Sequence, residues 1–320
     1  MTSTIELRNT LTLDYEVGPF ISLIVSFNEI SNKNDYLNLI ETVKAEFIKK
    51  HDENIWPRYE RKLRRFNFDR AKHIGNGSGV ALYVSFKAIH SFDLTQLVKT
   101  QISINDTMNV AQLIKEIESQ LHYRVLILRD NDFKLLRVDN GHFSILNLVN
   151  KPIPVLVNND KNKYFMLVKE YLSDLFDDDD YLQTVVVASE ENRKLFNELT
   201  DQKTFAKDIV SNVDMNDLGP DKISEMIEEL NQQFFDKLAN DNKIKYEKAS
   251  DHRLVATDLR DIISNALSGK IDTLYISEES YNKTLNDLAI TTIGFAGNVL
   301  LLPKKQMPMN LDYAAITLKF

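Results

Sequence analysis

The sequence predicts an α/β protein built from three domains. Its 320 residues exceed what a single hydrophobic core usually serves. Strand-like apolar runs alternate with amphipathic helical stretches, and this periodicity weakens near residues 120 and 215. We therefore expect an N-terminal α/β domain over residues 1–120, a middle domain over 121–215 and a C-terminal domain over 216–320.

The composition excludes several classes of protein and of site. With 43% hydrophobic and 27% charged residues, the chain has the composition of a soluble globular protein. No apolar run approaches the roughly 18 residues of a membrane span. Residues 1–16 lack the basic start and apolar stretch of a signal peptide, so we expect a cytoplasmic protein with no membrane partner. The absence of cysteine excludes disulfides, thiolate nucleophiles and cysteine-bound zinc.

The N-terminal segment opens with a predicted buried strand over residues 20–27 and an amphipathic helix over 35–50. A second helix is predicted over 56–70. A glycine-rich turn at 75–79 then leads into a strand over 80–86. Because these glycines precede a strand and do not open a helix, they predict a turn and not a phosphate-binding loop. Residues 101–120 are polar, with one helical stretch at 110–117, and separate this segment from the next.

The other two segments continue the alternation of strands and helices. The middle segment predicts a hairpin over 123–128 and 133–138, a strand over 143–149, a helix over 164–176, a strand over 184–188 and a helix over 190–199. The C-terminal segment predicts a long helix with an apolar stripe over 223–238, a helix capped by Thr257 and ended by Gly269, a strand over 272–276, a helix over 285–295, and strands over 299–302 and 313–320.

Several stretches carry a similarity to a known family, most specifically in the C-terminal segment. They are a cap and helix start at 256–263, the sequence Ala-Leu-Ser-Gly-Lys-Ile-Asp-Thr-Leu-Tyr-Ile at 266–276, Gly297, the strand at 299–302, Pro303, the Ala-Ala-Ile strand at 314–316, the strand at 123–128, the stretch 185–196, and Gly18-Pro19. With these markers in order over nearly the whole chain, the sequence resembles the bacterial archaeo-eukaryotic release factor-like family, which is related to release factors and Pelota.

This resemblance implies a middle domain with a mixed sheet like that of release factors and Pelota, and a C-terminal α/β/α domain like ribosomal kink-turn-binding proteins. It also implies a role in translation, with the ribosome or tRNA as partner. Release factors hydrolyse peptidyl-tRNA with a Gly-Gly-Gln loop, whose glycines permit an unusual backbone path and whose Gln positions a water. The present sequence has no adjacent glycines, and none of its nine glycines has a Gln two residues later. The release-factor resemblance therefore comes without that hydrolytic motif.

One stretch has the charge that phosphate binding requires. Its cations, set against only Glu60 and Asp69, are Arg58, Arg61, Lys62, Arg64, Arg65, Arg70 and Lys72. Helical spacing puts Arg58, Arg61, Lys62 and Arg65 on one side, and Tyr59, Phe66 and Phe68 interleave with the cations. These seven cations are the candidate nucleic-acid-binding residues. The alternative is a solvated helix face whose aromatic side chains turn to the core.

A second candidate site is the loop over residues 150–163, which corresponds in position to the catalytic loop of release factors. It offers Asn158, Asn159, Lys161 and Lys163, and its alternative interpretation is a solvated connector. The acidic block at 177–180 lacks the spacing and glycine of a calcium loop, and the six histidines show no metal-ligand spacing. The sequence therefore predicts no metal site and no cofactor.

Three functions are compatible with the sequence. The leading hypothesis is a non-enzymatic, translation-associated protein that contacts the ribosome or a tRNA. A divergent peptidyl-tRNA or RNA hydrolase would instead use polar residues of the 150–163 loop. The third hypothesis is a stress-response interaction scaffold without RNA contact, which the net charge of −8 favours because phosphate binding needs a positive surface.

Overall fold

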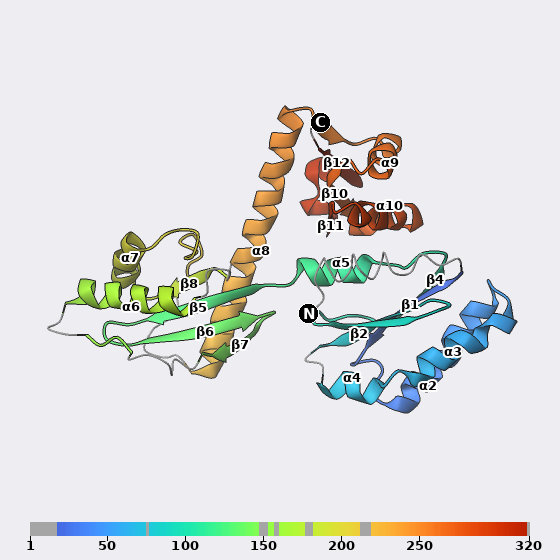
Figure 1. Ribbon diagram of the computed structural model, residues 1–320, viewed down its shortest axis with the longest axis horizontal. Coiled ribbons are helices and arrows are strands. Elements are labelled where there is room, and N and C mark those ends of the chain that lie inside the picture. The colour runs from blue at the N-terminus through green and yellow to red at the C-terminus, as the bar shows by residue number, and fades with distance from the viewer. Residues whose placement is uncertain are drawn as a thin grey trace. The chain divides into compact units, whose positions relative to one another are not determined.

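Figure 1 shows the computed structural model, which describes residues 18–74, 77–146, 153–156, 160–176, 182–211 and 219–318. In these residues three four-stranded sheets follow one another along the chain, and helices cover them, so the predicted α/β class is confirmed. The residues group into two compact units, Met1–Ser119 with Asn242–Phe320, and Gln120–Asp241. Each sheet lies within one of the three predicted segments, and the division into three domains near 120 and 215 stays a proposal. Of the described helices, none is long and apolar enough to cross a membrane.

The first sheet is antiparallel throughout. In sheet order its strands are β3 (Ile89–Leu94), β2 (Gly79–Val84), β1 (Phe20–Ser26) and β4 (Gln101–Asn105). Every residue of β1 is buried, because both faces of the sheet are covered. One face packs against α2 (Lys33–Ile48), α3 (Trp56–Arg65) and α4 (Phe68–Ile74), and the other shares a cluster with α5 (Ala111–Glu118).

The structure differs from the sequence prediction at two places in this segment. Where one helix was predicted over 56–70 there are two, because the backbone at Phe66 is extended (φ −63°, ψ 129°) and the Asn67 side chain accepts a hydrogen bond from the N–H of Arg70 in the next helix. The sequence also did not predict β3 and β4. In β4 only Ile102 and Ile104 alternate with polar residues, and pairing with β1 makes this weak pattern an edge strand.

The second sheet is mixed, as predicted. In sheet order its strands are β7 (His142–Ile145), β6 (Phe133–Asp139), β5 (His122–Leu128) and β8 (Thr184–Val187). β5 pairs antiparallel with β6 in the predicted hairpin and parallel with β8. One face packs against α6 (Lys161–Leu175) and α7 (Glu190–Leu199), and the other packs against Met226 and Leu230 of α8 (Pro220–Asp251). The expected hairpin with a helix across the sheet is therefore confirmed.

The third sheet has helices on both faces, which is the α/β/α arrangement that the resemblance implies. In sheet order its strands are β11 (Asn298–Leu302), β10 (Ile271–Ser277), β12 (Tyr313–Thr317) and β9 (Val255–Ala256). β10 and β11 run parallel and are joined through α10 (Lys283–Gly294), which packs on one face together with α9 (Leu259–Leu267). The end of α8 packs on the other face. Single 3-10 turns occur at η1 (Glu53–Ile55), η2 (Glu278–Ser280), η3 (Lys304–Gln306) and η4 (Pro308–Asn310).

Two helix boundaries in this segment differ from the prediction. α8 continues beyond the predicted stripe at 223–238, because Tyr246 packs edge-on against Tyr275 with ring centroids 5.7 Å apart. The N-cap of α9 is Asp258, whose carboxylate accepts a hydrogen bond from the N–H of Arg260, and not the predicted Thr257.

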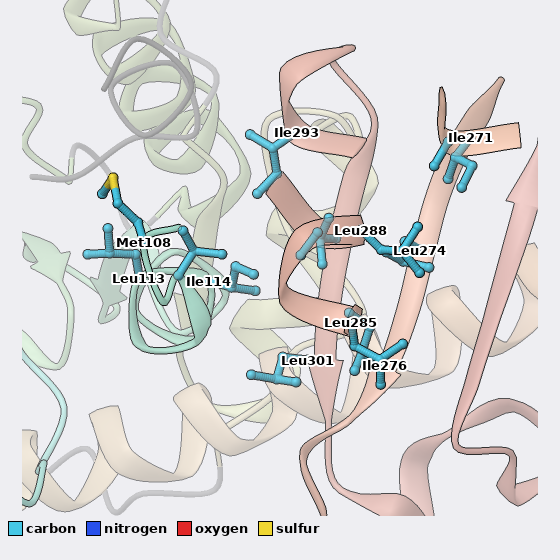
Figure 2. Packing of buried hydrophobic residues seen from close by; sticks show 14 of the residues in the cluster. Met108, Leu113, Ile114, Ile271, Leu274, Ile276, Leu285, Leu288, Ile293 and Leu301 are labelled. Carbon is cyan, nitrogen blue, oxygen red and sulfur yellow. The ribbon is translucent and has the colours of Figure 1, made fainter. Parts of the chain in front are cut away.

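α5 connects the first and third sheets within one compact unit. Leu113 and Ile114 lie in the same buried cluster as Ile293 of α10 and Leu301 of β11 (Figure 2). The side chain of Asn286 in α10, which is 5% exposed, adds polar contacts to the residues that precede α5. Its Oδ1 accepts hydrogen bonds from the N–H of Val110 (3.0 Å) and the hydroxyl of Tyr281 (2.7 Å), and its Nδ2 donates to the carbonyl of Met108 (2.8 Å).

Replacing the buried amide of Asn286 should weaken the contact between α10 and the start of α5. We expect Asn286→Ala to lower the free energy of unfolding by about 2–4 kcal/mol, because the N–H of Val110 and the carbonyl of Met108 would lose their partner in a buried setting. Urea denaturation would measure the loss. As a control, Asn38→Ala on the exposed side of α2 should change stability by no more than about 0.5 kcal/mol. Equal effects of the two substitutions would contradict this account.

Candidate nucleic-acid interface

The candidate basic residues lie on two short helices whose apolar sides are anchored in the core. Pro57 stands in the first turn of α3, where its missing N–H costs nothing. Trp56, Tyr59 and Leu63 recur at three- and four-residue spacing and are all buried. The Tyr59 hydroxyl also donates a hydrogen bond to the carbonyl of Pro19 (2.8 Å). This anchoring turns the opposite side of α3 to solvent.

The interleaved aromatic residues belong to the core. Tyr59 is fully buried, and Phe68 is 2% exposed and stacks on Tyr36 with ring centroids 5.1 Å apart. Phe66 is partly buried and packs against the same cluster. Aromatic side chains in these positions cannot serve as a stacking platform for bases. Any contact of this surface with nucleic acid would therefore be electrostatic.

Three of the seven candidate cations already bind groups of the protein. The Lys62 ammonium donates hydrogen bonds to the carbonyls of Ser85 and Phe86, each at 2.6 Å, and the Lys72 ammonium donates to the carbonyl of Ser31 at 2.6 Å. Arg64 pairs with Glu60 (2.7 Å) and Glu41 (2.6 Å), and the hydrogen bond to Glu60 raises the pKa of Arg64. Lys62 thus differs from the exposed cation that helical spacing predicted: it is partly buried and held.

The other four cations are exposed. Arg61, Arg65 and Arg70 have no side-chain partner among the described residues, and the guanidinium of Arg58 lies 4.2 Å from the centroid of the Phe86 ring. At about 100° per residue, Arg58, Arg61 and Arg65 share one side of α3. We call these three residues the arginine face. Arg70 stands apart on α4.

Phe86 is the residue of this surface that the sequence did not indicate. It follows β2 and lies close in space to α3, where its ring orients Arg58 and its carbonyl accepts from Lys62. No local pattern around residues 58–65 points to a partner more than 20 residues away. Only the packing of α3 against the first sheet brings the two segments together.

The structure alters the prediction for the second candidate site, the loop over residues 150–163. Asn158 and Asn159 lie outside the described residues, as does the acidic block at 177–180. Lys161 and Lys163 belong to the first turn of α6 and not to the loop that was predicted for them. The Lys161 ammonium pairs with Asp130 at 3.0 Å, whereas Lys163 is exposed and has no side-chain partner in the described part of the chain.

Asp130 is held from two sides. The Asn192 amide donates a hydrogen bond to it at 2.8 Å, and this bond, followed by the one from Lys161, lowers the pKa of the carboxyl. Within the described ranges, no group of three His, Asp or Glu side chains is arranged to hold a metal ion. The described residues of this region therefore form an ion-pair network between the turn after β5 and the starts of α6 and α7.

A family model matches part of the chain. Residues 151–270 match the description "Bacterial archaeo-eukaryotic release factor family 3". Over these 120 residues the chain is similar to the bacterial archaeo-eukaryotic release factor-like family. The matched residues include the stretch at 185–196 and the helix and Gly-Lys pair that end at residue 270, so the resemblance predicted from the sequence is confirmed.

Solved structures similar to the chain include translation factors. The crystal structure of the archaeal translation termination factor aRF1 shares 14% identity over 99% of this chain and 98% of that one, with a TM-score of 0.28. Ribosome-bound archaeal Pelota, from a model with ABCE1, shares 11% identity over 99% and 94%, with a TM-score of 0.46. Dom34 of S. cerevisiae, a translation termination-like factor, shares 12% identity over 75% and 78%, with a TM-score of 0.41. None of the curated proteins matches the sequence.

The cations of α3 should separate into structural and surface residues when they are replaced. Lys62→Met should lower the free energy of unfolding by about 1.5–3 kcal/mol, because the carbonyls of Ser85 and Phe86 lose a charged donor. Arg61→Gln should change it by no more than about 0.5 kcal/mol. Thermal and urea denaturation of both variants would test this difference, and a stable Lys62→Met protein would contradict it.

Proposed function

We propose that this protein is translation-associated and contacts ribosomal RNA or a tRNA through the arginine face. The observation that carries the proposal is the pair Arg61 and Arg65. Both cations are exposed, have no side-chain partner among the described residues, and lie on one side of a helix whose other side is buried. The match of residues 151–270 to a release factor-like family model supports a role in translation. The two observations together favour RNA over an acidic protein as the ligand.

The physical case for RNA depends on how the cations are displayed. Guanidinium groups bind phosphate oxygens in a bidentate manner, and each neutralised phosphate releases condensed counterions. Because α3 is fixed to the sheet by Trp56, Tyr59 and Leu63, little backbone freedom would be lost on binding. The buried aromatic residues leave only phosphate contacts, which position the partner and do not read its sequence.

We further propose that the protein binds its target without hydrolysing an ester. The sequence has no Gly-Gly-Gln or Gly-X-Gln stretch. A divergent hydrolase would need another group to position the attacking water. Lys161, one candidate for such a role, is engaged by Asp130.

The arginine face should determine how binding depends on salt. We expect Arg61→Gln with Arg65→Gln to weaken binding to ribosomes by about tenfold at low salt, and to reduce the slope of log K against log salt by about 2, because two phosphate contacts are lost. Cosedimentation with ribosomes and filter binding of tRNA, each over a range of KCl concentrations, would measure both quantities. Gln keeps helix propensity, so the double variant should remain folded.

A matched control removes two cations elsewhere in the same compact unit. Lys243 and Lys248 are exposed residues of α8, and Lys243→Gln with Lys248→Gln gives the same change in net charge. This control should bind nearly as the parent does. If both double variants lose affinity equally, net charge and not the arginine face governs binding; if neither does, the interface lies elsewhere and the proposal fails.

Hydrolysis can be tested separately from binding. We expect purified protein to release no peptide from peptidyl-tRNA above background, with or without ribosomes, because the sequence has no Gly-Gly-Gln or Gly-X-Gln motif to position the attacking water. A release assay on programmed ribosomes, with an active release factor as positive control, would measure this. Turnover that Lys163→Ala or Asn158→Ala abolishes would support the hydrolase hypothesis instead.

A further inference from the structure

A cavity of about 190 Å³ lies beside the edge strand β11, in the unit formed by Met1–Ser119 and Asn242–Phe320. Its apolar lining comes from Ile114 and Ile117 of α5, Ile293 of α10 and Val299 of β11. Ile114 and Ile293, which both line the cavity, belong to the buried cluster drawn in Figure 2. The cavity is larger than one of about 150 Å³ that holds a benzene molecule, and smaller than the ~300 Å³ at which drug-sized pockets begin.

One acidic side chain lines this cavity without a charged partner. Oε1 of Glu118 accepts a hydrogen bond from the N–H of Leu301 at 2.9 Å. The other carboxylate oxygen has no hydrogen-bond partner among the described residues. Burial raises the pKa of Glu118 to about 8, although the hydrogen bond from Leu301 opposes this change.

The charged groups nearby are already paired with one another. Lys115, on the same helix, forms an ion pair with Glu278 at 2.6 Å. Lys245 of α8, which also lines the cavity, pairs with Asp272 at 2.7 Å and donates a hydrogen bond to the Thr273 hydroxyl at 2.8 Å. Both cations are therefore engaged in ion pairs, although the charge of Lys115 also opposes the rise in the pKa of Glu118. Of the ionisable groups around the cavity, Glu118 alone adds an uncompensated negative charge when it ionises.

We propose that this cavity binds an alkylammonium group, with the alkyl stem against Ile114, Ile117 and Ile293 and the ammonium on the free oxygen of Glu118. A guanidinium fits less well, because its two parallel donors need both carboxylate oxygens and Leu301 already occupies one. An anion would find both lysines paired, and Glu118 would repel it once the carboxyl ionises. A free amine and the side chain of a lysine on a partner present the same group. This proposal is independent of the arginine face.

Titration of the full chain with n-butylamine, followed by NMR, tests the proposal. At pH near 8.5 we expect binding at about millimolar affinity, since a five-atom ligand has little surface to bury. The neutral analogue 1-butanol should bind about tenfold more weakly, because it cannot form the charged hydrogen bond. Equal binding of the two ligands, or no binding of butylamine, would overturn the proposal.

The pH dependence provides a second test that needs no variant. Below about pH 8 the Glu118 carboxyl of the empty cavity is protonated, and a bound cation must displace that proton. Affinity for butylamine, which stays charged in this range, should rise by up to about tenfold per pH unit from about pH 6 to about pH 8 and then level off. A flat profile would exclude Glu118 as the binding group.

Glu118→Gln is the matched variant, because its amide oxygen can still accept the hydrogen bond from Leu301. It should lose about tenfold affinity for butylamine, keep its affinity for 1-butanol and show no pH dependence. Since the pKa is raised on folding, wild-type stability falls as pH rises from about 4.5 to about 8, so the variant should be at least as stable at pH near 8.5. Unchanged affinity in a folded variant would contradict the proposal.

Nα-acetyl-lysine N-methylamide then identifies the source of the group. If it binds as butylamine does, the cavity admits a lysine side chain from a partner. If only butylamine binds, the ligand is a free amine.

Discussion

Helix α5 must bury apolar side chains against two sheets at once, and the larger compact unit depends on this constraint. Leu113 and Ile114 share one cluster with Ile24 of the first sheet and with Leu274 of the third. A helix of eight residues is marginal by itself, and its N-cap, Val110, has no side-chain capping bond. The acceptor for the Val110 N–H is instead Asn286, far along the chain. α5 is therefore stable only where the N-terminal and C-terminal parts of the chain meet.

The sequence predicted those elements whose stability is local or whose burial is complete. β1 and the β5–β6 hairpin were found because continuous or alternating apolar runs leave few other structures. β4 was missed because it gains its apolar contacts by pairing with β1, which is distant in sequence. β3 forms a hairpin with the neighbouring β2, but its apolar residues Ile89, Phe92 and Leu94 do not alternate regularly with polar ones. The break at Phe66 was missed because the charge pattern runs on through it, while the backbone turns so that Phe68 can reach Tyr36 in the core.

The sequence showed that residues 58–72 are rich in cations, but it did not show which of these cations form a free surface. Seven cations within 15 residues could be read from the sequence. Which of them already bind groups of the protein depends on carbonyls after β2 and on Glu41 of α2, whose positions only the fold determines. Lys62 and Arg61 are neighbours with the same charge, yet one holds a loop of the first sheet and the other faces solvent. The net charge of −8 conceals this difference, because it averages paired and unpaired groups.

The Glu118 side chain joins α5 to β11 and is also the proposed binding group for an alkylammonium ligand. β11 is an edge strand, and the Leu301 N–H that points out of the sheet needs an acceptor. A carboxyl supplies that acceptor in either protonation state, because the neutral acid keeps a carbonyl oxygen. An amide would do so as well and would not suffer the cost of a buried charge. The cost of ionising a carboxyl here therefore has no explanation in the docking of α5, and a cation in the cavity would offset it.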